Sequence, residues 1–306
     1  MSVRDSGVDA VDLVILPPSR DLGDGFTVRR ALPQPQRRMV GPFIFFDQMG
    51  PVALRDGQGL DVRPHPHIGL ATITYLVEGE IMHRDSLGSV QAIRPGEVNW
   101  MTAGSGITHS ERSPENARHG GGAGLFGLQL WVALPAQHEE TAPSFAHHGA
   151  DEIPSGETNG VTVRQIVGAM DGLVSPVKTL SEMVYAEIVM TPGSRYRLPS
   201  EQVERAFYLI AGAVTVDGQP FGPSELVILK PHAEIVLASE QGARLVMVGG
   251  EPFPEQRFIY WNFVSSRADR IEQAKRDWQE QRFARVPEEV EFIPLPAEPA
   301  PPVRYP

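Results

Sequence analysis

The chain has 306 residues, 41% hydrophobic and 21% charged, which is enough apolar material for a buried core and about two domains. Its formal net charge of −11 disfavours contact with nucleic-acid phosphates, so no direct nucleic-acid partner is expected. The absence of cysteine excludes disulfides and thiolate sites. No apolar stretch approaches the roughly 20 residues of a membrane helix, and the N-terminus lacks a signal-peptide layout. We therefore expect a cytoplasmic protein with no membrane partner.

Short strands dominate the predicted elements. Residues 71–111 alternate strand-length apolar pieces with glycine-bearing turns, which is typical of an all-β sandwich or barrel. One helix is predicted over about 267–283, where Ile271, Ala274 and Trp278 recur on one face. Ser266, which precedes this segment, and Asp269 near its start resemble a capping box. The proline-rich residues from 294 onward are expected to run extended over the surface.

An internal repeat divides the chain. YLVEG at 75–79 matches YLIAG at 208–212, and PGEV at 95–98 matches PSEL at 223–226. The residues between the two copies are polar and rich in turn formers. We therefore predict a first lobe over 1–136, a linker over 137–160, and a similar second lobe over 161–306 that includes the helix and the proline-rich tail.

Histidines and one glutamate form the most informative constellation. His65 and His67 alternate along a predicted strand, as do His109 and Glu111 along another, so each pair shares a face. Three imidazoles and one carboxylate would suit Fe(II), Mn, Ni, Cu or Zn. A single histidine is more often a surface residue or a hydrogen-bonded core residue than a metal ligand. The residues alone do not decide between these interpretations.

Three segments resemble a known family. GLDVRPHPHIGLATITYLVEGE at 59–80 resembles the first cupin motif, and AGSGITHSE at 103–111 resembles the second motif in its pirin form. GPFIFFDQMGP at 41–51 resembles the pirin N-terminal signature. The chain is thus identified as a member of the pirin family, similar to bacterial quercetin 2,3-dioxygenase-like proteins. The resemblance implies two tandem cupin barrels (double-stranded β-helix or jelly-roll) and a C-terminal helix.

The resemblance also implies the site. Carried over position by position, it makes His65, His67, His109 and Glu111 the ligands of one metal ion per chain. Fe(II) is expected, with Mn, Ni, Cu and Zn as alternatives. Common cupins place their glutamate four or five residues after the His-x-His pair, where this chain has Ala71 and Thr72. The pirin pattern takes the carboxylate after the last histidine, and Glu111 stands there as expected ligand and catalytic base.

The second copy lacks these ligands. Counting along the repeat from Tyr208 and Glu225 reaches only leucines and serines at the four ligand positions: Leu198, Ser200, Leu237 and Ser239. A metal-free second barrel is therefore predicted.

Two functions follow from the resemblance. The first is a metal-dependent dioxygenase that opens the ring of a flavonol such as quercetin, whose adjacent hydroxyl and ketone can chelate an ion. The alternative is a non-catalytic, metal-dependent regulator that binds a transcription factor or metabolic enzyme. A small aromatic substrate or a protein partner is accordingly expected, and the chain is expected to be a monomer.

Other conspicuous residues carry weaker expectations. His83 is a candidate neighbour of the metal ligands. His147 and His148 are expected to be solvated in the linker. The residues Phe45, Phe46 and Asp47 could line the mouth of the site or simply pack in a core.

Overall fold

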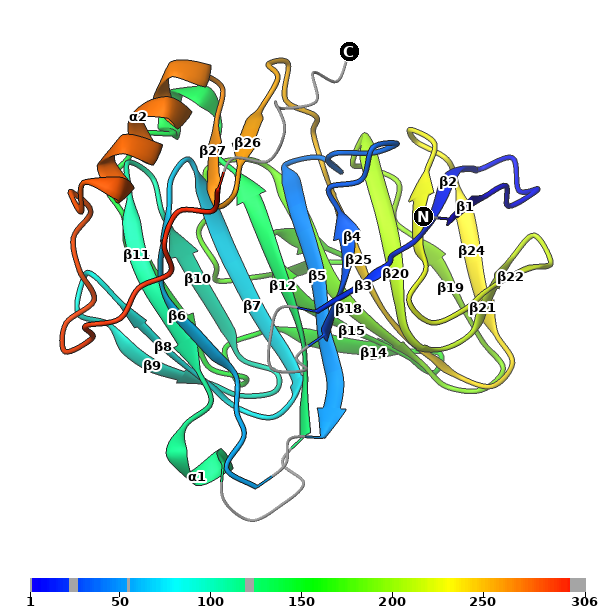
Figure 1. Cartoon of the computed structure of the whole chain (residues 1–306). Helices are drawn as coiled ribbons and strands as arrows, with labels where there is room; N and C mark the ends of the chain where they lie inside the picture. The colour runs from blue at the N-terminus through cyan, green and yellow to red at the C-terminus, as the bar shows by residue number, and fades with distance from the viewer. Residues whose placement is uncertain (1, 22–26, 54–55, 119–123, 298–306) are drawn as a thin grey trace. The chain divides into compact units, whose positions relative to one another are not determined.

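The computed structural model describes residues 2–21, 27–53, 56–118 and 124–297, and it is built mainly from strands, as the sequence predicts (Figure 1). Contacts group the chain into two compact units. Unit 1 combines Met1–Gln48 with His148–Phe253, and unit 2 combines Met49–His147 with Pro254–Pro306. The N-terminal strands thus group with the second half of the chain, and the C-terminal helix groups with the first. The domain boundaries expected at residues 136 and 160 stay a prediction.

Unit 2 contains two facing sheets. In one, the strands β13, β10, β7, β12 and β5 are neighbours in that order, and in the other the order is β6-β11-β8-β9. Side chains of the two sheets meet between them, since the ring centroids of Trp131 on β12 and His67 on β6 lie 5.1 Å apart. The strands are β5 (Phe43–Ala53), which belongs to unit 1 up to Gln48, β6 (Asp61–His67), β7 (Leu70–Glu78), β8 (Ile81–Asp85), β9 (Val90–Ile93), β10 (Val98–Thr102), β11 (Ile107–Arg112), β12 (Gly124–Ala133) and β13 (Ser144–His148).

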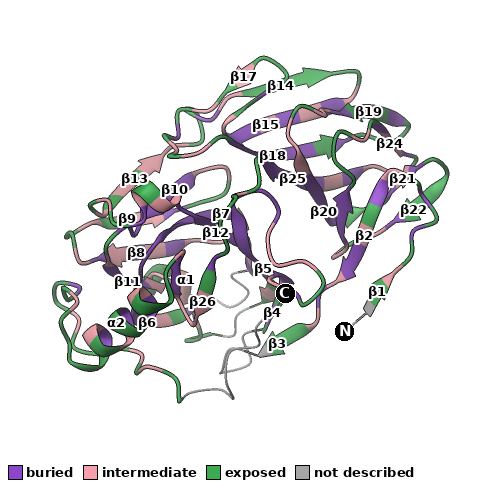
Figure 2. Ribbon diagram, turned by 90° about the horizontal axis from the view of Figure 1, so that it is seen from above, coloured by how far each residue is buried: buried purple, intermediate pink, exposed green. Residues whose placement is uncertain are grey.

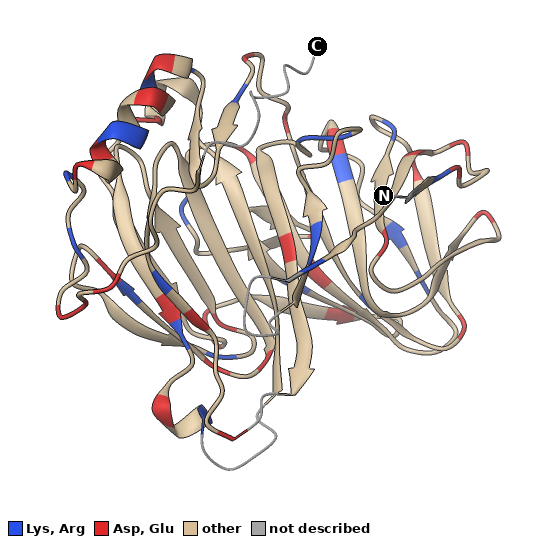
Figure 3. Cartoon of the chain, in the orientation of Figure 1, with Lys and Arg blue, Asp and Glu red and all other residues tan. Residues whose placement is uncertain are grey.

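The central strands of unit 2 are uncharged and buried. β10 and β12 contain no charged residue and β7 contains one, at its end, whereas β6, β8 and β11 of the other sheet each carry two (Figure 3). Burial along β7 and β12 is nearly continuous (Figure 2). Despite this burial, β7 carries Thr72 and Thr74, and β12 carries Gln129. The space between the sheets of unit 2 therefore has a polar lining.

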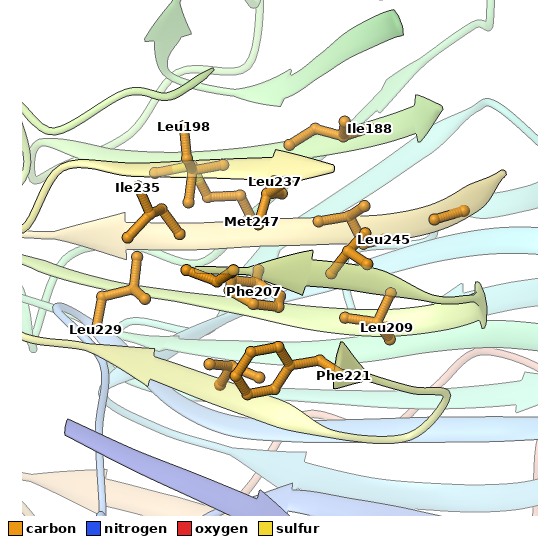
Figure 4. Packing of buried hydrophobic residues seen from close by; sticks show 14 of the residues in the cluster. Ile188, Leu198, Phe207, Leu209, Phe221, Leu229, Ile235, Leu237, Leu245 and Met247 are labelled. Atoms are coloured by element: carbon orange, nitrogen blue, oxygen red, sulfur yellow. The ribbon is translucent and has the colours of Figure 1, made fainter. Parts of the chain in front are cut away.

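Unit 1 also consists of a larger and a smaller sheet, but its core is apolar. An eight-stranded sheet, β1-β2-β23-β20-β25-β18-β15-β14, accompanies a four-stranded sheet, β19-β24-β21-β22. Leu198, Phe207 and Leu237 belong to its core, which is filled with hydrocarbon side chains (Figure 4). The strands are β1 (Ser2–Arg4), β2 (Val11–Leu16), β14 (Ser155–Thr158), β15 (Val161–Val167), β18 (Met183–Met190), β19 (Ser194–Leu198), β20 (Glu204–Gly212), β21 (Val214–Val216), β22 (Gln219–Phe221), β23 (Leu226–Leu229), β24 (Ile235–Ser239) and β25 (Ala243–Gly250).

The repeat seen in the sequence reappears in the strand order. The order β10-β7-β12-β5 is matched by β23-β20-β25-β18, and β6-β11-β8-β9 is matched by β19-β24-β21-β22. The smaller elements are the hairpins β3 (Ser19–Asp21) with β4 (Thr27–Leu32), β16 (Ala169–Met170) with β17 (Leu173–Val174), and β26 (Phe258–Tyr260) with β27 (Phe263–Ser265), the short helix α1 (Glu115–Arg118) and the 3-10 turn η1 (Ala136–His138).

The predicted C-terminal helix is present as α2 (Ala268–Gln279). Its buried residues Ile271, Ala274 and Trp278 pack against Ile68 and Phe263, which confirms the predicted apolar face. None of the described helices is long and apolar enough to cross a membrane. The proline-rich tail falls largely on residues 298–306, outside the described residues.

The expected capping box of α2 is wrong. The N-cap residue is Arg267, and it makes no capping side-chain hydrogen bond. Ser266 instead donates its hydroxyl to Oε2 of Glu139 at 3.0 Å. Glu139 is buried and also accepts from the Ser265 hydroxyl at 2.9 Å, so a carboxylate distant in the chain orients the side chains that precede the helix.

Candidate metal centre

Two paired strands bring the three predicted histidines together. β6 and β11 are antiparallel, with His65 opposite His109 and His67 opposite Ile107. All three histidines are buried, and one nitrogen from each lies within 4.8 Å of the others. Alternation on two neighbouring strands, the feature read from the sequence, is the cause of this convergence.

Glycine turns hold these strands in register. Gly69 (φ +66°) follows β6 and Gly104 (φ +53°) precedes β11, and Gly69 N–H donates to the Gly104 carbonyl at 2.8 Å. A Cβ atom on Gly69 would lie 2.0 Å from the Val264 oxygen, and one on Gly104 would lie 2.0 Å from the Thr141 oxygen. Positive φ and close backbone approach therefore both require glycine here.

The nitrogen positions suit one divalent ion. Nε2 of His67 and Nε2 of His109 lie 3.0 Å apart. Two nitrogens at about 2.1 Å from a shared ion and at a right angle to each other would be separated by about 3 Å. Nδ1 of His65 lies 2.9 Å from the Arg63 carbonyl, which it can serve as a donor, leaving Nε2 as the ligand atom.

Burial keeps these imidazoles neutral. Desolvation lowers the pKa of His65 to about 4, against an opposing effect of the Arg63 carbonyl. The pKa values of His67 and His109 are well below the usual histidine value, first through burial and then through repulsion from neighbouring imidazoles. Only the neutral ring offers an electron pair to a metal, so the triad is in its ligand form at neutral pH.

Glu111 lies outside this cluster. The group of converging ligand atoms found among the described residues contains only the three histidines. Glu111 is partly exposed, and its Oε1 accepts from the Thr74 hydroxyl at 3.3 Å. Desolvation raises the pKa of Glu111, opposed by His83 and by the bond from Thr74. Its expected roles as fourth ligand and base stay predictions.

The structure places His83 beside the triad, as expected, and adds a neighbour that sequence reasoning missed. His83 is buried, with Nδ1 3.4 Å from Nδ1 of His109 and Nε2 3.0 Å from Asp85 Oδ2. His83 was a candidate from its position, whereas nothing local marked Asp85. The expectation that His147 is solvated holds only in part: its side chain is 23% exposed, but β13 pairs with β10 and places Nδ1 of His147 2.8 Å from Asn99 Oδ1. Only the pairing of distant strands reveals these contacts.

The N-terminal signature residues build a core in unit 1. The Phe46 ring packs against Tyr208, with centroids 4.9 Å apart. Asp47 forms an ion pair with Arg30 at 2.8 Å, and that guanidinium lies 4.4 Å from the centroid of Phe45. Of the two readings left open for these residues, the described contacts support packing.

Leucines stand at two of the corresponding positions of unit 1, and Tyr196, which pairs with Leu237, stands where His65 does. Leu198 pairs with Ile235 as His67 pairs with Ile107, so Leu198 is the counterpart of His67 and Leu237 is the counterpart of His109. Counting along the sequence had assigned Leu198 to His65. The two-residue difference arises because the connection from β19 to β20 is longer than that from β6 to β7. Leucine offers no ligand atom to a metal, and the metal-free second barrel stays a prediction.

Comparisons with known proteins cover most of the chain. The family model described as Pirin matches residues 25–132, and the Pirin C-terminal cupin domain matches 185–284. A pirin-like protein of Caulobacter vibrioides is 49% identical, covering 94% of this chain and 99% of that protein. A Pseudomonas aeruginosa protein provisionally named a quercetin 2,3-dioxygenase is 40% identical, covering 87% and 84%. The crystal structure of quercetin 2,3-dioxygenase from Acinetobacter baumannii matches with a TM-score of 0.86 at 36% identity, covering 94% and 95%.

Proposed function

Because the chain belongs to the pirin family, with two cupin domains and a C-terminal helix, we propose that it is a metal-dependent dioxygenase that opens the ring of flavonols such as quercetin. One observation carries the proposal. A buried, neutral histidine triad with metal-ligand spacing stands in a chain that is closely similar to a quercetin 2,3-dioxygenase over nearly its whole length. Fold alone would not support the activity, since cupins serve many functions.

We propose Fe(II) as the ion, one per chain, held by His65, His67 and His109, with Glu111 completing the set. Mn, Ni, Cu and Zn accept the same nitrogen and oxygen ligands. When bound, such an ion would lower the pKa of the flavonol hydroxyl and supply the centre at which flavonol and dioxygen react.

The residues of the chain would hold the substrate and move its proton. Glu111 would accept the flavonol hydroxyl proton, and its raised pKa makes it a stronger base than an exposed glutamate. Thr74 can orient that carboxylate through its hydroxyl. Trp131 beside His67 provides an apolar wall that would exclude water and accommodate an aromatic ligand.

The test is oxygen uptake by metal-free protein reloaded with one equivalent of Fe(II) under anaerobic conditions and then mixed with quercetin in air. One dioxygen consumed per flavonol is expected, and the His109→Ala protein should show none. Tight metal binding without uptake, with each of iron, manganese, nickel and copper, would overturn the enzymatic proposal and favour the regulatory alternative. Location in the cytoplasm and a monomeric state stay predictions.

A further inference from the structure

A buried carboxylate sits at the end of a line of polar groups that reaches the metal centre. Asp85 is fully buried at the end of β8, opposite His109 in the pairing of β8 with β11. Its Oδ1 accepts the backbone N–H groups of Leu87 at 2.9 Å and Ser89 at 3.0 Å. Its Oδ2 lies 3.0 Å from Nε2 of His83. The carboxylate is therefore held in one orientation by its own turn.

The orientation of the Asp85 carboxylate determines where the hydrogens lie on His83 and His109. An ionised carboxylate only accepts, so Nε2 of His83 must carry a hydrogen. A neutral imidazole carries one hydrogen, which leaves an electron pair on Nδ1 of His83. That atom lies 3.4 Å from Nδ1 of His109, which must then be the donor. Nε2 of His109 is left with a free electron pair, and it is the atom that faces His67.

We propose that Asp85 and His83 are positioning residues that fix His109 in its Nδ1–H tautomer and so present Nε2 to the metal. This inference rests on the proposed metal site. The Arg63 carbonyl has the same role for His65: it lies 2.9 Å from Nδ1 and can hold the hydrogen on that nitrogen without an intermediate side chain. For His109 the side chains of Asp85 and His83, here called the relay, take the place of that carbonyl.

The competing explanation is that His83 is a packing residue. Its ring is stacked on Phe145, with centroids 4.3 Å apart and planes inclined by 12°. Phe145→Leu removes this stacking and leaves the atoms of the relay in place. It is therefore the matched control for substitutions in the relay.

The decisive variant is Asp85→Asn. Asparagine has nearly the same shape, and its oxygen can still accept from Leu87 and Ser89. Its amide would donate to Nε2 of His83 and so reverse every hydrogen along the line, placing one on Nε2 of His109. We expect about 10–100-fold weaker binding of Zn²⁺ or Fe²⁺, the usual effect of losing such an outer partner, measured by competition with a chelator. Binding within two-fold of the parent would overturn the proposal.

A double variant separates the relay from general loss of packing. His83→Phe is expected to weaken metal binding on its own, while Phe145→Leu is expected to leave it within two-fold. Adding Asp85→Asn to His83→Phe should have no further effect, because the path from Asp85 to His109 runs through His83. Additive losses would show that Asp85 acts by another route.

The proton positions can also be read in the parent protein without any metal. Nitrogen-15 NMR of histidine-labelled, metal-free protein at about pH 8 should show His109 as the Nδ1–H tautomer. Asp85→Asn should invert His109. A parent His109 with its hydrogen on Nε2, or a doubly protonated His83, would overturn the relay. This measurement stands apart from the proposed function, because a protein without dioxygenase activity could still show the expected tautomers.

Discussion

The Thr74 hydroxyl on β7 lies 3.3 Å from the Glu111 carboxylate on β11, so a donor on one sheet of unit 2 faces an acceptor on the other. Glu111→Gln keeps the size and one oxygen but is a far poorer base. We expect turnover of quercetin to fall by about 10²–10⁴-fold at matched metal content, with flavonol binding largely retained. Oxygen uptake per bound iron and the flavonol absorbance shift measure the two effects. Equal turnover would remove Glu111 as the base.

Removing a histidine should abolish metal retention and leave the fold intact. His67→Ala or His109→Ala deletes one of three converging nitrogens, whereas the surrounding barrel keeps its own core. Elemental analysis should find one ion per chain in the parent and almost none in the variants. Unchanged circular dichroism is expected, with His148→Ala as the control. An unfolded variant would contradict this expectation.

The counterpart substitution in unit 1 should have the opposite effect. Leu237 occupies the place of His109 but is fully buried in hydrocarbon. Leu237→Ala should lower the free energy of unfolding by about 2–5 kcal/mol through lost burial and the cavity left behind. Metal content should stay at one ion per chain. Denaturant unfolding of the metal-free protein measures the stability, and elemental analysis of the loaded protein measures the metal content. A loss of metal would show that metal binding in unit 2 depends on the core of unit 1.

Stability of the metal-free protein should depend on pH in a defined window. His65 is neutral in the folded protein down to a pKa of about 4, whereas the unfolded chain takes up its proton at the ordinary value near 6.5. The unfolded state thus binds more protons below about pH 6.5, and stability falls as the pH is lowered from there to about 4. His65 alone accounts for about 3 kcal/mol at most. Denaturant midpoints at several pH values measure this loss, and a flat profile would contradict it.

The buried carboxylate beneath α2 should be a major support of that helix. Glu139 lies 3.2 Å from Nε of the fully buried Arg257, and it accepts from Ser265 and from the Ser266 backbone. Glu139→Ala would leave the guanidinium without this partner, at a cost of about 3–5 kcal/mol. Thermal unfolding should detect this, with the exposed Glu140→Ala as the control. A loss below about 1 kcal/mol would show that Glu139 is not a major support of α2.

Local patterns account for much of the fold and for the histidine triad. The strands β7 and β10 could be predicted because each is a short apolar run bounded by glycine turns. The metal cluster could be predicted because alternation places ligands on one face of each of two strands. These features depend on residues close together in the chain, or on a motif that a family preserves.

Contacts between distant residues could not be predicted in the same way. Asp85 meets the triad only through the register of β8 on β11, and Ser266 turns to Glu139 across 127 positions of sequence. The capping box failed for this reason, since the bonds to Glu139 fix how the Ser266 side chain is oriented and local sequence does not reveal them.

The interleaving of the two units constrains how the chain can fold as it is made. Val14 on β2 pairs with Val227 on β23, so an early strand has to await a partner more than 200 residues later, and unit 2 also needs residues from 254 onward. Neither unit can be completed while the ribosome is still producing the middle of the chain. Such long-range pairing implies slow folding, during which unpaired strand edges stay exposed and dependent on protection from aggregation. A fragment ending at residue 136 would contain every proposed ligand and still lack part of the unit that positions them.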